Sequence, residues 1–498
     1  IFATVASLVS AYVLIPFLAE RQLVSKESVT AFLSEIASFF AIVGGAVAIL
    51  AFVAMPALLP LVVPGIASSP FQSELLWLSR LLLVQPILLG LSGILGAVTQ
   101  LSHRFVLYSL SPLLYNAGII IGVFFFYPIW GIQGLGVGVV LGALLHVLIQ
   151  IPVLFAEGYS VRWKIPTSGF YHVIKIALPR AAARASTQIT LLVLVGFASF
   201  FAVGSIAVFS LALNVQSVPL SIIAISYSVA AFPTLAGFIA RKEHEQFLLH
   251  MSAAVRHILF WSIPAIVLFI VLRAQIVRVI LGSGAFSWED TRLTAAALAL
   301  FVISLVAQGL NVLFIRAYYA AGKTALPSSI AALGMVATII LAFLFSYIFE
   351  HSVLVRRAIE VLLRVEGISG THVLVLPFAY SVGVFSMLAA FSYYFRRDFG
   401  GLAPGLRRVV LQVFCSSVIG GFAAYLTLVL VLPFVDTDTF FGIFSQGLSA
   451  GIVGLAVTVF LLYLVKNIEL MEAVSSLSRR LLRPKDVPPG QDLEETLS

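Results

Sequence analysis

Apolar stretches long enough to cross a membrane recur from one end of this 498-residue chain to the other. A helix of about 20 apolar residues spans a bilayer core that is about 30 Å thick. Apolar residues make up 61% of the chain, charged residues only 10%, and the mean hydropathy is +1.11. No soluble domain has enough interior to bury that much apolar surface. The sequence therefore predicts an all-α polytopic membrane protein.

The apolar stretches predict about 13 transmembrane helices. Their approximate bounds are 1–19, 36–62, 74–101, 105–127, 132–156, 179–203, 205–238, 253–280, 293–320, 325–349, 371–395, 408–434 and 440–466. The one cysteine, Cys415, lies inside such a stretch, so we expect no disulfide framework and no thiol metal site. The glycine-rich segment 131–142 also lies in a span, which favours close helix packing over a phosphate-binding loop.

Lysine and arginine are concentrated in alternate connections between the spans. The odd-numbered connections and the C-terminal tail carry them, and the second, fourth, sixth and twelfth connections carry none. By the positive-inside rule, the odd connections and the C-terminus are cytoplasmic. This distribution accounts for a pI near 9.6 without nucleic acid as a partner. Residues 1–19 lack the basic flank and cleavage site of a signal peptide.

Two even-numbered connections break this pattern. The eighth contains Arg273, Arg278 and Arg292, and the tenth contains Arg356, Arg357 and Arg364. In the tenth connection, apolar residues recur at helical spacing, which predicts an amphipathic helix at 351–366 lying on the outer membrane surface. Those apolar positions are Leu354, Ala358, Val361 and Val365.

Two halves of the chain read as copies of one another, about 217 residues apart. Segment 10–19 aligns with 229–236, placing Pro16 on Pro233, and segment 90–104 aligns with 309–323. Such a repeat predicts two related helical bundles that move about a central site. The second copy has a span, 179–201, that has no counterpart in the first. We therefore expect that one preceding helix is absent from this chain and that the intact number is 14.

Several segments, in this order and spacing, resemble the MurJ (MviN) lipid II flippases of the MOP exporter superfamily. They are Val62–Ile66, Ser111–Gly122, Val140–Pro152, Asn214–Ala236 and Arg316–Pro327. The resemblance implies two six-helix lobes around a central cavity, plus two helices that form a groove for a lipid tail. It implies a transporter without cofactors that flips undecaprenyl-pyrophosphate-linked peptidoglycan precursor outward across the bacterial cytoplasmic membrane. The implied partners are that precursor, membrane lipids and the peptidoglycan synthesis machinery, and the chain is expected to be a monomer.

The same resemblance divides the chain into regions. They are an N-terminal lobe at 1–156, a cytoplasmic linker at 157–178, a C-terminal lobe at 179–395, the two groove helices at 405–466, and a basic, then disordered, cytoplasmic tail at 467–498. Two features depart from the family. Its arginine-rich first helix is missing here, and an arginine common in the helix matching 205–238 is replaced by Asn214.

Candidate pyrophosphate-binding residues are cations and amides in the spans. Arg180 and Arg184 are four residues apart, hence on one helix face, and the planar fork of arginine pairs two phosphate oxygens at once. The alternative is that they anchor the span at the headgroups. Asn214, Gln216 and Gln188 lie in apolar spans, where a buried amide either faces a cavity or bonds a neighbouring helix.

Arg256, Arg316 and Lys323 lie near the expected cytoplasmic ends of spans. They are candidates for a gate or for a funnel that attracts phosphate, and the alternative is that they are snorkelling anchors. The eight histidines show no ligand spacing, so we expect no metal site.

The positions of carboxylates help to choose among transporter classes. Glu35, Glu74, Asp436 and Asp438 all fall at span ends or in loops, and none lies at mid-depth. Cation-coupled multidrug exporters of the same superfamily usually work through an intramembrane carboxylate. The pattern thus favours an anionic substrate over a MATE-like drug/cation antiporter. A flippase for another polyprenyl-linked glycan, such as O-antigen or teichoic units, stays open, and no cluster suits a membrane-embedded transferase.

Overall fold

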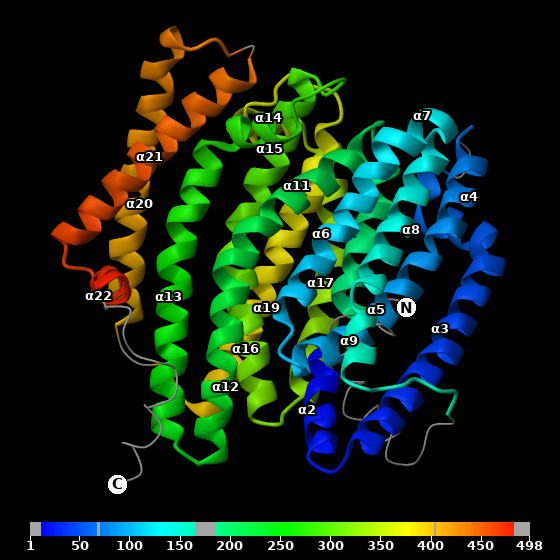
Figure 1. Ribbon diagram of the computed structural model, residues 1–498. Coiled ribbons are helices and arrows are strands. Elements are labelled where there is room, and N and C mark those ends of the chain that lie inside the picture. The colour runs from blue at the N-terminus through cyan, green and yellow to red at the C-terminus, as the bar shows by residue number, and fades with distance from the viewer. Residues whose placement is uncertain (1–10, 67–69, 165–184, 403–404, 438, 483–498) are drawn as a thin grey trace. The chain divides into compact units, whose positions relative to one another are not determined.

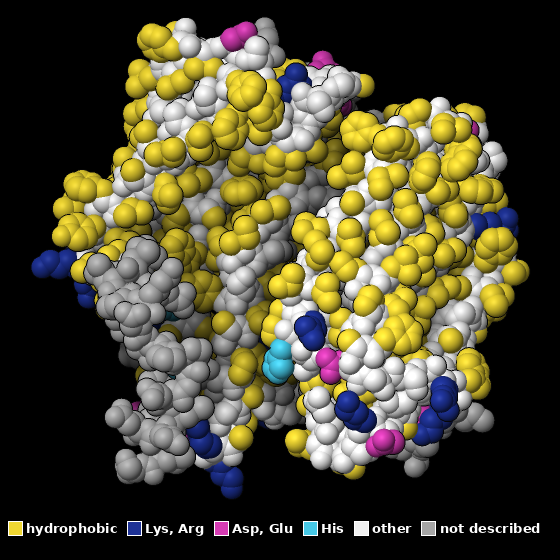
Figure 2. Space-filling view, viewed as in Figure 1, with side chains coloured by type: hydrophobic (Ala, Val, Ile, Leu, Met, Phe, Trp, Pro, Cys, Tyr) yellow, Lys and Arg dark blue, Asp and Glu magenta, His cyan; other side chains and the backbone are white. Residues whose placement is uncertain are grey.

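Every regular element in the described part of the computed structural model is a helix (Figure 1). The structure describes residues 11–66, 70–164, 185–402, 405–437 and 439–482. Ten helices in this part are long and apolar enough to cross a membrane, or eleven if the bent pair Trp288–Ile303 and Leu305–Ala320 is one span. Hydrophobic side chains cover most of the face seen in Figure 2, with few charges among them. The all-α polytopic fold is therefore confirmed.

The exact number of 13 spans stays a prediction. The expected spans 1–19 and 179–203 fall partly on residues outside the described ranges. Within the second of them, a shorter apolar helix covers Ala185–Ala198.

Backbone contacts divide the chain into two compact units. The first unit contains Ile1–Ser210, Gly322–Leu362 and Glu366–Ala390, and the second contains Leu211–Ala321, Leu363–Val365 and Phe391–Ser498. Three of the described helices contribute to both units: α11 (Ser205–Pro219), α18 (Val353–Leu363) and α19 (Val375–Phe399). The two units are described separately below.

The first unit is a helical bundle built mainly from the N-terminal part of the chain. Its buried core includes Leu18, Phe32, Phe40 and Ile94. Its helices are α2 (Ala11–Gln22), α3 (Lys26–Val62), α4 (Gln72–Leu82), α5 (Val84–Leu101), α6 (Phe105–Ile121), α7 (Tyr127–Trp130), α8 (Ile132–Leu148), α9 (Ile151–Ala156), α17 (Ala325–His351) and nearly all of α18 (Val353–Leu363).

A seam of glycines lets α6 and α8 pack with their backbones almost touching. A Cβ atom on Gly118 would lie 2.2 Å from the Cα of Gly142, and one on Gly138 would lie 2.4 Å from the Cα of Gly122. Only glycine permits such an approach, which is the usual use of small residues between membrane helices. The glycine-rich segment 131–142 therefore serves helix packing, as the sequence predicted.

The segment that follows α9, residues 157–164, lies along α3, and we call it the strap. The backbone N–H of Arg162 donates to Ser34 Oγ at 3.1 Å, and that of Lys164 donates to Ser38 Oγ at 3.0 Å. Between these two bonds, Lys164 Nζ lies 3.0 Å from Glu35 Oε1. Only 7% of the Glu35 side chain is exposed, so this pairing neutralises a buried carboxylate.

The second unit combines the C-terminal half of the repeat with the last three helices. A cluster of aromatic rings forms much of its interior, including Phe247, Phe314 and Phe395, with ring centroids of Phe314 and Phe395 5.1 Å apart. Its helices are the ends of α11 and α19, α12 (Ser226–Ala240), α13 (His244–Val271), α14 (Arg273–Leu281), α15 (Trp288–Ile303), α16 (Leu305–Ala320), α20 (Leu406–Val431), α21 (Phe440–Leu464) and α22 (Ile468–Leu482).

Helices α20 and α21 form a hairpin that packs on α13 and α14 (Figure 1). Small residues again bring the two helices together, since a Cβ on Gly420 would collide with Thr458 and one on Gly454 would lie 2.8 Å from Ala424 Cβ. The short helix α22 occupies the start of the segment 467–498, which was predicted to be a basic, then disordered, tail.

The expected span 253–280 is divided at Leu272, between α13 and α14. Arg273 follows the break, and its guanidinium donates to Ile270 O at 3.4 Å and to Leu363 O at 3.2 Å.

The three arginines of the eighth connection have structural partners. Besides Arg273, Arg292 donates to Arg364 O through Nε at 3.1 Å, and Arg278 Nη1 donates to Phe286 O at 2.9 Å. Leu363 and Arg364 lie at the C-terminal end of α18, whose last carbonyls have no partner inside the helix. These cations therefore cap backbone carbonyls.

The internal repeat is visible in the order and interruption of the helices. In the first copy, α4 and α5 are separated by a break at Leu83, and in the second copy α15 and α16 are separated by a 42° bend at Ser304. Helix α18, in the tenth connection, forms as expected, with Leu354 and Val361 exposed.

Candidate functional site

The two arginines expected to bind pyrophosphate, Arg180 and Arg184, lie outside the described residues. The amide Gln188 lies on the helix Ala185–Ala198 of the first unit, and its side chain is exposed. Asn214 and Gln216 belong to the second unit.

The span 205–240 changes its winding in the middle. Helix α11 ends at Pro219, a π-helical turn η3 (Leu220–Ile225) follows, and α12 continues to Ala240. Proline lacks the N–H that an α-helix needs, so Pro219 accounts for the change of winding. Such π-helical turns are frequent at functional sites.

The two amides of this span face opposite ways. Asn214 is exposed, whereas Gln216 is 1% exposed and its Nε2 has no hydrogen-bond partner among the described residues. Spacing alone did not distinguish them. In the structure, the Asn214 side chain is exposed, and the Gln216 side chain is buried within the second unit.

Asn214 begins a polar stripe along the exposed face of this span. Ser217 and Ser221 follow at helical spacing and are also exposed. Ser217 Oγ donates to Asn214 O at 2.7 Å and Ser221 Oγ to Ser217 O at 2.8 Å, while Ser226 Oγ donates to Ser221 O at 3.0 Å. A polar stripe on an otherwise apolar span is expected to face a wet cavity rather than lipid.

The three gate or funnel candidates have different surroundings. Arg256 Nε lies 3.1 Å from Glu469 Oε1 of α22, so this cation is held in an ion pair. Arg316 is half-buried on α16 of the second unit. Lys323 is exposed in the turn before α17 of the first unit.

One intramembrane polar network was missed by the sequence analysis. Ser92 Oγ of α5 lies 2.6 Å from His146 Nδ1 of α8, and Gln150 Nε2 bonds both Ser92 Oγ and, at 2.9 Å, His146 O. The edge of the His146 ring faces Tyr115, whose hydroxyl accepts from Gln85 Nε2 at 2.7 Å. The signal was available, because His146 is the one titratable side chain in the span 132–156.

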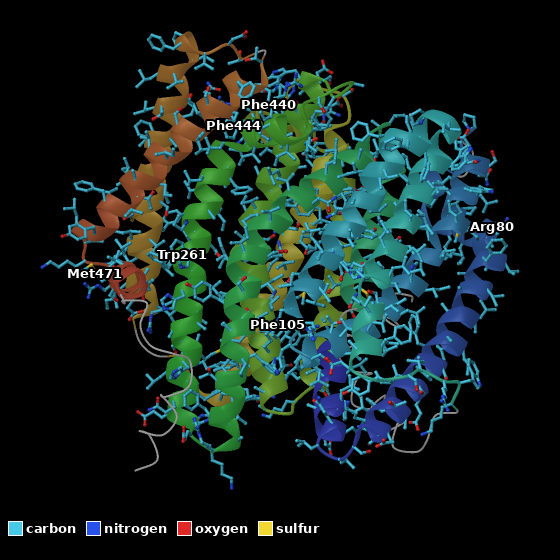
Figure 3. All side chains as sticks on the ribbon, viewed as in Figure 1. Arg80, Phe105, Trp261, Phe440, Phe444 and Met471 are labelled. Atoms are coloured by element: carbon cyan, nitrogen blue, oxygen red, sulfur yellow. The ribbon has the colours of Figure 1, made fainter. Side chains whose placement is uncertain are left out.

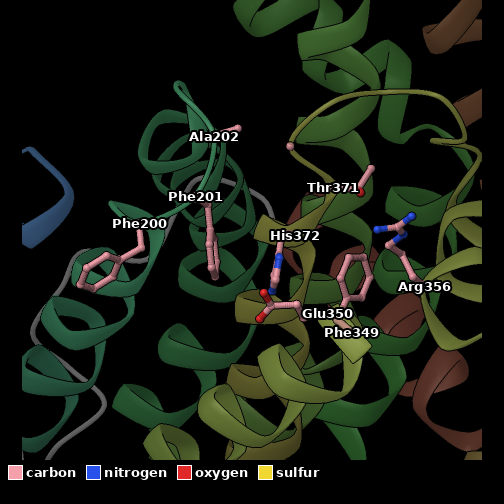
Figure 4. Close-up of a pocket in the computed structure, with 9 residues that line it drawn as sticks. Phe200, Phe201, Ala202, Phe349, Glu350, Arg356, Thr371 and His372 are labelled. Atoms are coloured by element: carbon pink, nitrogen blue, oxygen red, sulfur yellow. The ribbon is translucent and has the colours of Figure 1, made fainter. Parts of the chain in front are cut away.

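A pocket of about 360 Å³ lies in the first unit beside the ends of α17 and α18 (Figure 4). His372 stacks on Phe201 with ring centroids 4.5 Å apart, and Thr371 Oγ1 donates to Glu360 at 2.7 Å. Arg356 and Glu350 also line the pocket. Aromatic faces with charges of both signs suit a polar, uncharged or zwitterionic group better than a bare anion. Among the described residues, no group of three or more His, Cys, Asp or Glu side chains could hold a metal.

The long apolar helices, several of them broken or packed through glycines, define this protein as a multi-pass membrane protein. A solved structure titled lipid II flippase MurJ, inward closed conformation, matches with a TM-score of 0.71 and 22% identity, over 97% of this chain and 90% of that one. An inward-facing MATE multidrug transporter of the MOP superfamily matches with a TM-score of 0.65 and 14% identity, over 82% of this chain and 88% of that one. At these identities, the likeness shows the fold.

The family model described as lipid II flippase MurJ matches residues 5–445, so the chain belongs to the MurJ family. Probable lipid II flippases MurJ are similar to parts of the chain. The Thermotoga maritima protein is 27% identical over 231 residues, 46% of each chain. The Haemophilus influenzae protein is 29% identical over 266 residues, 51% of this chain and 52% of that one. In these matches the chain spans about half the length of each relative.

Proposed function

We propose that this protein is a flippase that moves undecaprenyl-pyrophosphate-linked peptidoglycan precursor, lipid II, outward across the bacterial cytoplasmic membrane. The observation that carries the proposal is the match of the MurJ family model to residues 5–445. The polar stripe that begins at Asn214 supports it, because a headgroup that crosses the membrane needs polar groups along its path.

In this proposal, the pyrophosphate is held by cations and amide donors in a wet cavity. Arg184 and Arg180 supply charge, and the exposed amides of Asn214 and Gln188 supply N–H donors. Hydrogen bonds from charged donors to phosphate are about twice as strong as neutral ones, so the arginines hold the substrate and the amides orient it. Arg316 and Lys323 attract the headgroup at the cytoplasmic side.

The lipid tail would lie against the α20–α21 hairpin. Long apolar side chains there are exposed, including Phe414 at 53%, Phe422 at 61% and Phe460 at 59%. Lipid tails are as apolar as this surface, so a polyprenyl chain gains no hydrophobic free energy by moving from lipid onto the hairpin. We therefore expect the hairpin to bind the tail weakly.

Transport would proceed by alternating access of two lobes, 1–156 and 179–395, joined by the linker 157–178, with the C-terminus in the cytoplasm. The working protein would be a monomer that receives lipid II from, and delivers it to, the peptidoglycan synthesis machinery.

The alternative of a drug/cation antiporter is weaker. In the described spans, Glu35 is the buried carboxylate nearest to mid-span, and Lys164 already neutralises it at 3.0 Å. A proton- or sodium-coupled antiporter needs a carboxylate that is free to exchange its cation.

The test is to deplete the protein in its native host and label lipid II from outside the cell. Lipid II should accumulate in the inner leaflet and escape the label, and restoring the gene should return it to the outer leaflet. Normal outward labelling during depletion would refute the proposal. Parallel labelling of O-antigen or teichoic-acid precursors tests the alternative of a flippase for another polyprenyl-linked glycan. If that alternative holds, depletion should strand only those precursors in the inner leaflet.

A further inference from the structure

A second pocket, of about 410 Å³, lies in the second unit where α14 meets the turn of the α20–α21 hairpin. Its chemistry differs from that of the pocket in Figure 4. It contains one cation, two amides, a hydroxyl and an indole ring, and its eight lining residues include no carboxylate. They are Ala274, Gln275, Arg278, Trp288, Leu432, Thr437, Ile443 and Gln446.

The cation of this pocket is held in place by its surroundings. Arg278 Nη1 donates to Phe286 O at 2.9 Å, and its guanidinium carbon lies 6.0 Å from the centre of the Trp288 ring. Gly282 makes room for the side chain, because a Cβ there would lie 2.4 Å from Arg278 Cδ. None of the other residues that line the pocket is a carboxylate that could neutralise Arg278, so its charge is directed toward a ligand.

The amides are also fixed. Gln446 is 4% exposed, and its Nε2 donates to Leu428 O at 3.1 Å. Its Oε1 accepts from Gln275 Nε2 at 3.4 Å, which leaves Gln275 with a second amide hydrogen. Gly447 permits this approach, since a Cβ there would lie 3.1 Å from Gln275 Cβ. The pocket thus presents a positive charge and hydrogen-bond donors on a rigid frame.

An exposed apolar surface adjoins this polar pocket. Leu432, which lines the pocket, is 51% exposed, and on the first turns of α21 Phe440 is 56% and Phe444 is 44% exposed (Figure 3). A ligand that fills both surfaces must carry an anionic head and an apolar body.

We propose that this pocket binds the phosphodiester headgroup of an anionic phospholipid of the surrounding membrane, with its acyl chains lying along α21. Arg278 contacts the phosphate oxygens, Gln275 and Thr437 donate to the headgroup, and Trp288 lies at the level where indole rings favour the membrane interface. The bound lipid bridges α14 and the hairpin turn. This site does not depend on the flippase activity proposed above.

The test measures the binding of phosphatidylglycerol to the purified full-length chain. Native mass spectrometry detects the bound lipid, and the shift of the unfolding temperature reports the stabilisation. Diacylglycerol and inorganic phosphate are added separately at matched concentrations. We expect phosphatidylglycerol to bind and stabilise, and the two separate components to do neither. Equal stabilisation by diacylglycerol, or by inorganic phosphate alone, would overturn the lipid assignment.

Three variants locate the site. Arg278→Gln should weaken phosphatidylglycerol binding at least about tenfold, because a charge-assisted bond is lost. Gln275→Glu should weaken it similarly through repulsion while keeping the Arg278 cap. The matched control, Arg292→Gln, removes a different carbonyl-capping arginine outside the pocket and should leave the affinity unchanged. Wild-type affinity in Gln275→Glu, or an equal loss in Arg292→Gln, would refute the proposal.

Discussion

Arg256 of α13 and Glu469 of α22 form an ion pair, with Arg256 Nε 3.1 Å from Glu469 Oε1 and only 2% of the Glu469 side chain exposed. Beside it, His257 Nε2 lies 3.4 Å from Glu472 Oε2. Glu469 is therefore buried against α13, whereas the Glu472 side chain is 55% exposed and Met471 is 49% exposed (Figure 3). The apolar side chains Ile468, Met471 and Val474 are exposed on this helix, which suits a helix lying at a membrane surface.

Breaking this ion pair from the arginine side should be the more damaging change. Arg256→Gln leaves a buried carboxylate without its cation and should cost about 3 kcal/mol of stability, whereas Glu469→Gln should cost less. Thermal unfolding of the purified variants measures the difference. The double variant should recover much of the loss, and a double variant as unstable as Arg256→Gln would contradict the pairing.

The glycine seam between α6 and α8 should not tolerate a methyl group. Gly138→Ala places a Cβ 2.4 Å from the Gly122 Cα and should destabilise the protein by about 2 kcal/mol, seen as a lower unfolding temperature. The control is Gly45→Ala on α3, where a Cβ would meet nothing within 4 Å. That change should be neutral or stabilising because alanine favours a helix. Equal losses in both variants would argue against close packing at the seam.

The two amides of α11 should separate transport from stability. Asn214→Leu should lower outward labelling of lipid II about tenfold with little change in unfolding temperature, because Asn214 is exposed. Gln216→Leu should leave transport near normal and keep or raise stability, because it removes a buried, unpartnered Nε2. The reverse pattern, with Gln216→Leu inactive and Asn214→Leu active, would mean that the polar stripe does not face the substrate.

The strap along α3 should depend on Lys164. Lys164→Met removes the ion pair that ties residues 157–164 to Glu35 of α3, and it should raise the rate of proteolysis within 157–164 several-fold, because this segment opens more often. Lys26→Met is the matched control, since Lys26 Nζ makes only an exposed 3.4 Å contact to Glu157 O. Unchanged protection in Lys164→Met would show that the two serine hydrogen bonds suffice.

Local patterns account for the features that were predicted correctly. Apolar length identified most of the spans, and helical spacing indicated a helix in the tenth connection, where α18 lies. The glycines of 131–142 indicated close packing. Each of these depends on a residue and its neighbours within a few turns, which a sequence contains directly.

The candidate site was harder to predict from the sequence than the fold. Asn214 and Gln216 are two residues apart and chemically alike, yet one is exposed and the other is 1% exposed. The Ser92–His146–Gln150 network joins residues from two helices, and histidine was weighed only as a metal ligand. Which side of a helix meets another helix depends on the partner, and the partner is distant in sequence.

The sequence by itself determined that this chain is a bundle of membrane helices, because the bilayer requires apolar length and internally satisfied backbone hydrogen bonds. The sequence also determined the MurJ family, whose model matches residues 5–445. The tertiary structure alone decided what individual charges do. Arg273, Arg278 and Arg292 cap carbonyls, and Arg256 holds α22. An arginine in so apolar a chain needs an oxygen atom that accepts its hydrogen bonds. Which oxygen accepts them depends on which distant segments the fold brings within about 3 Å of the guanidinium.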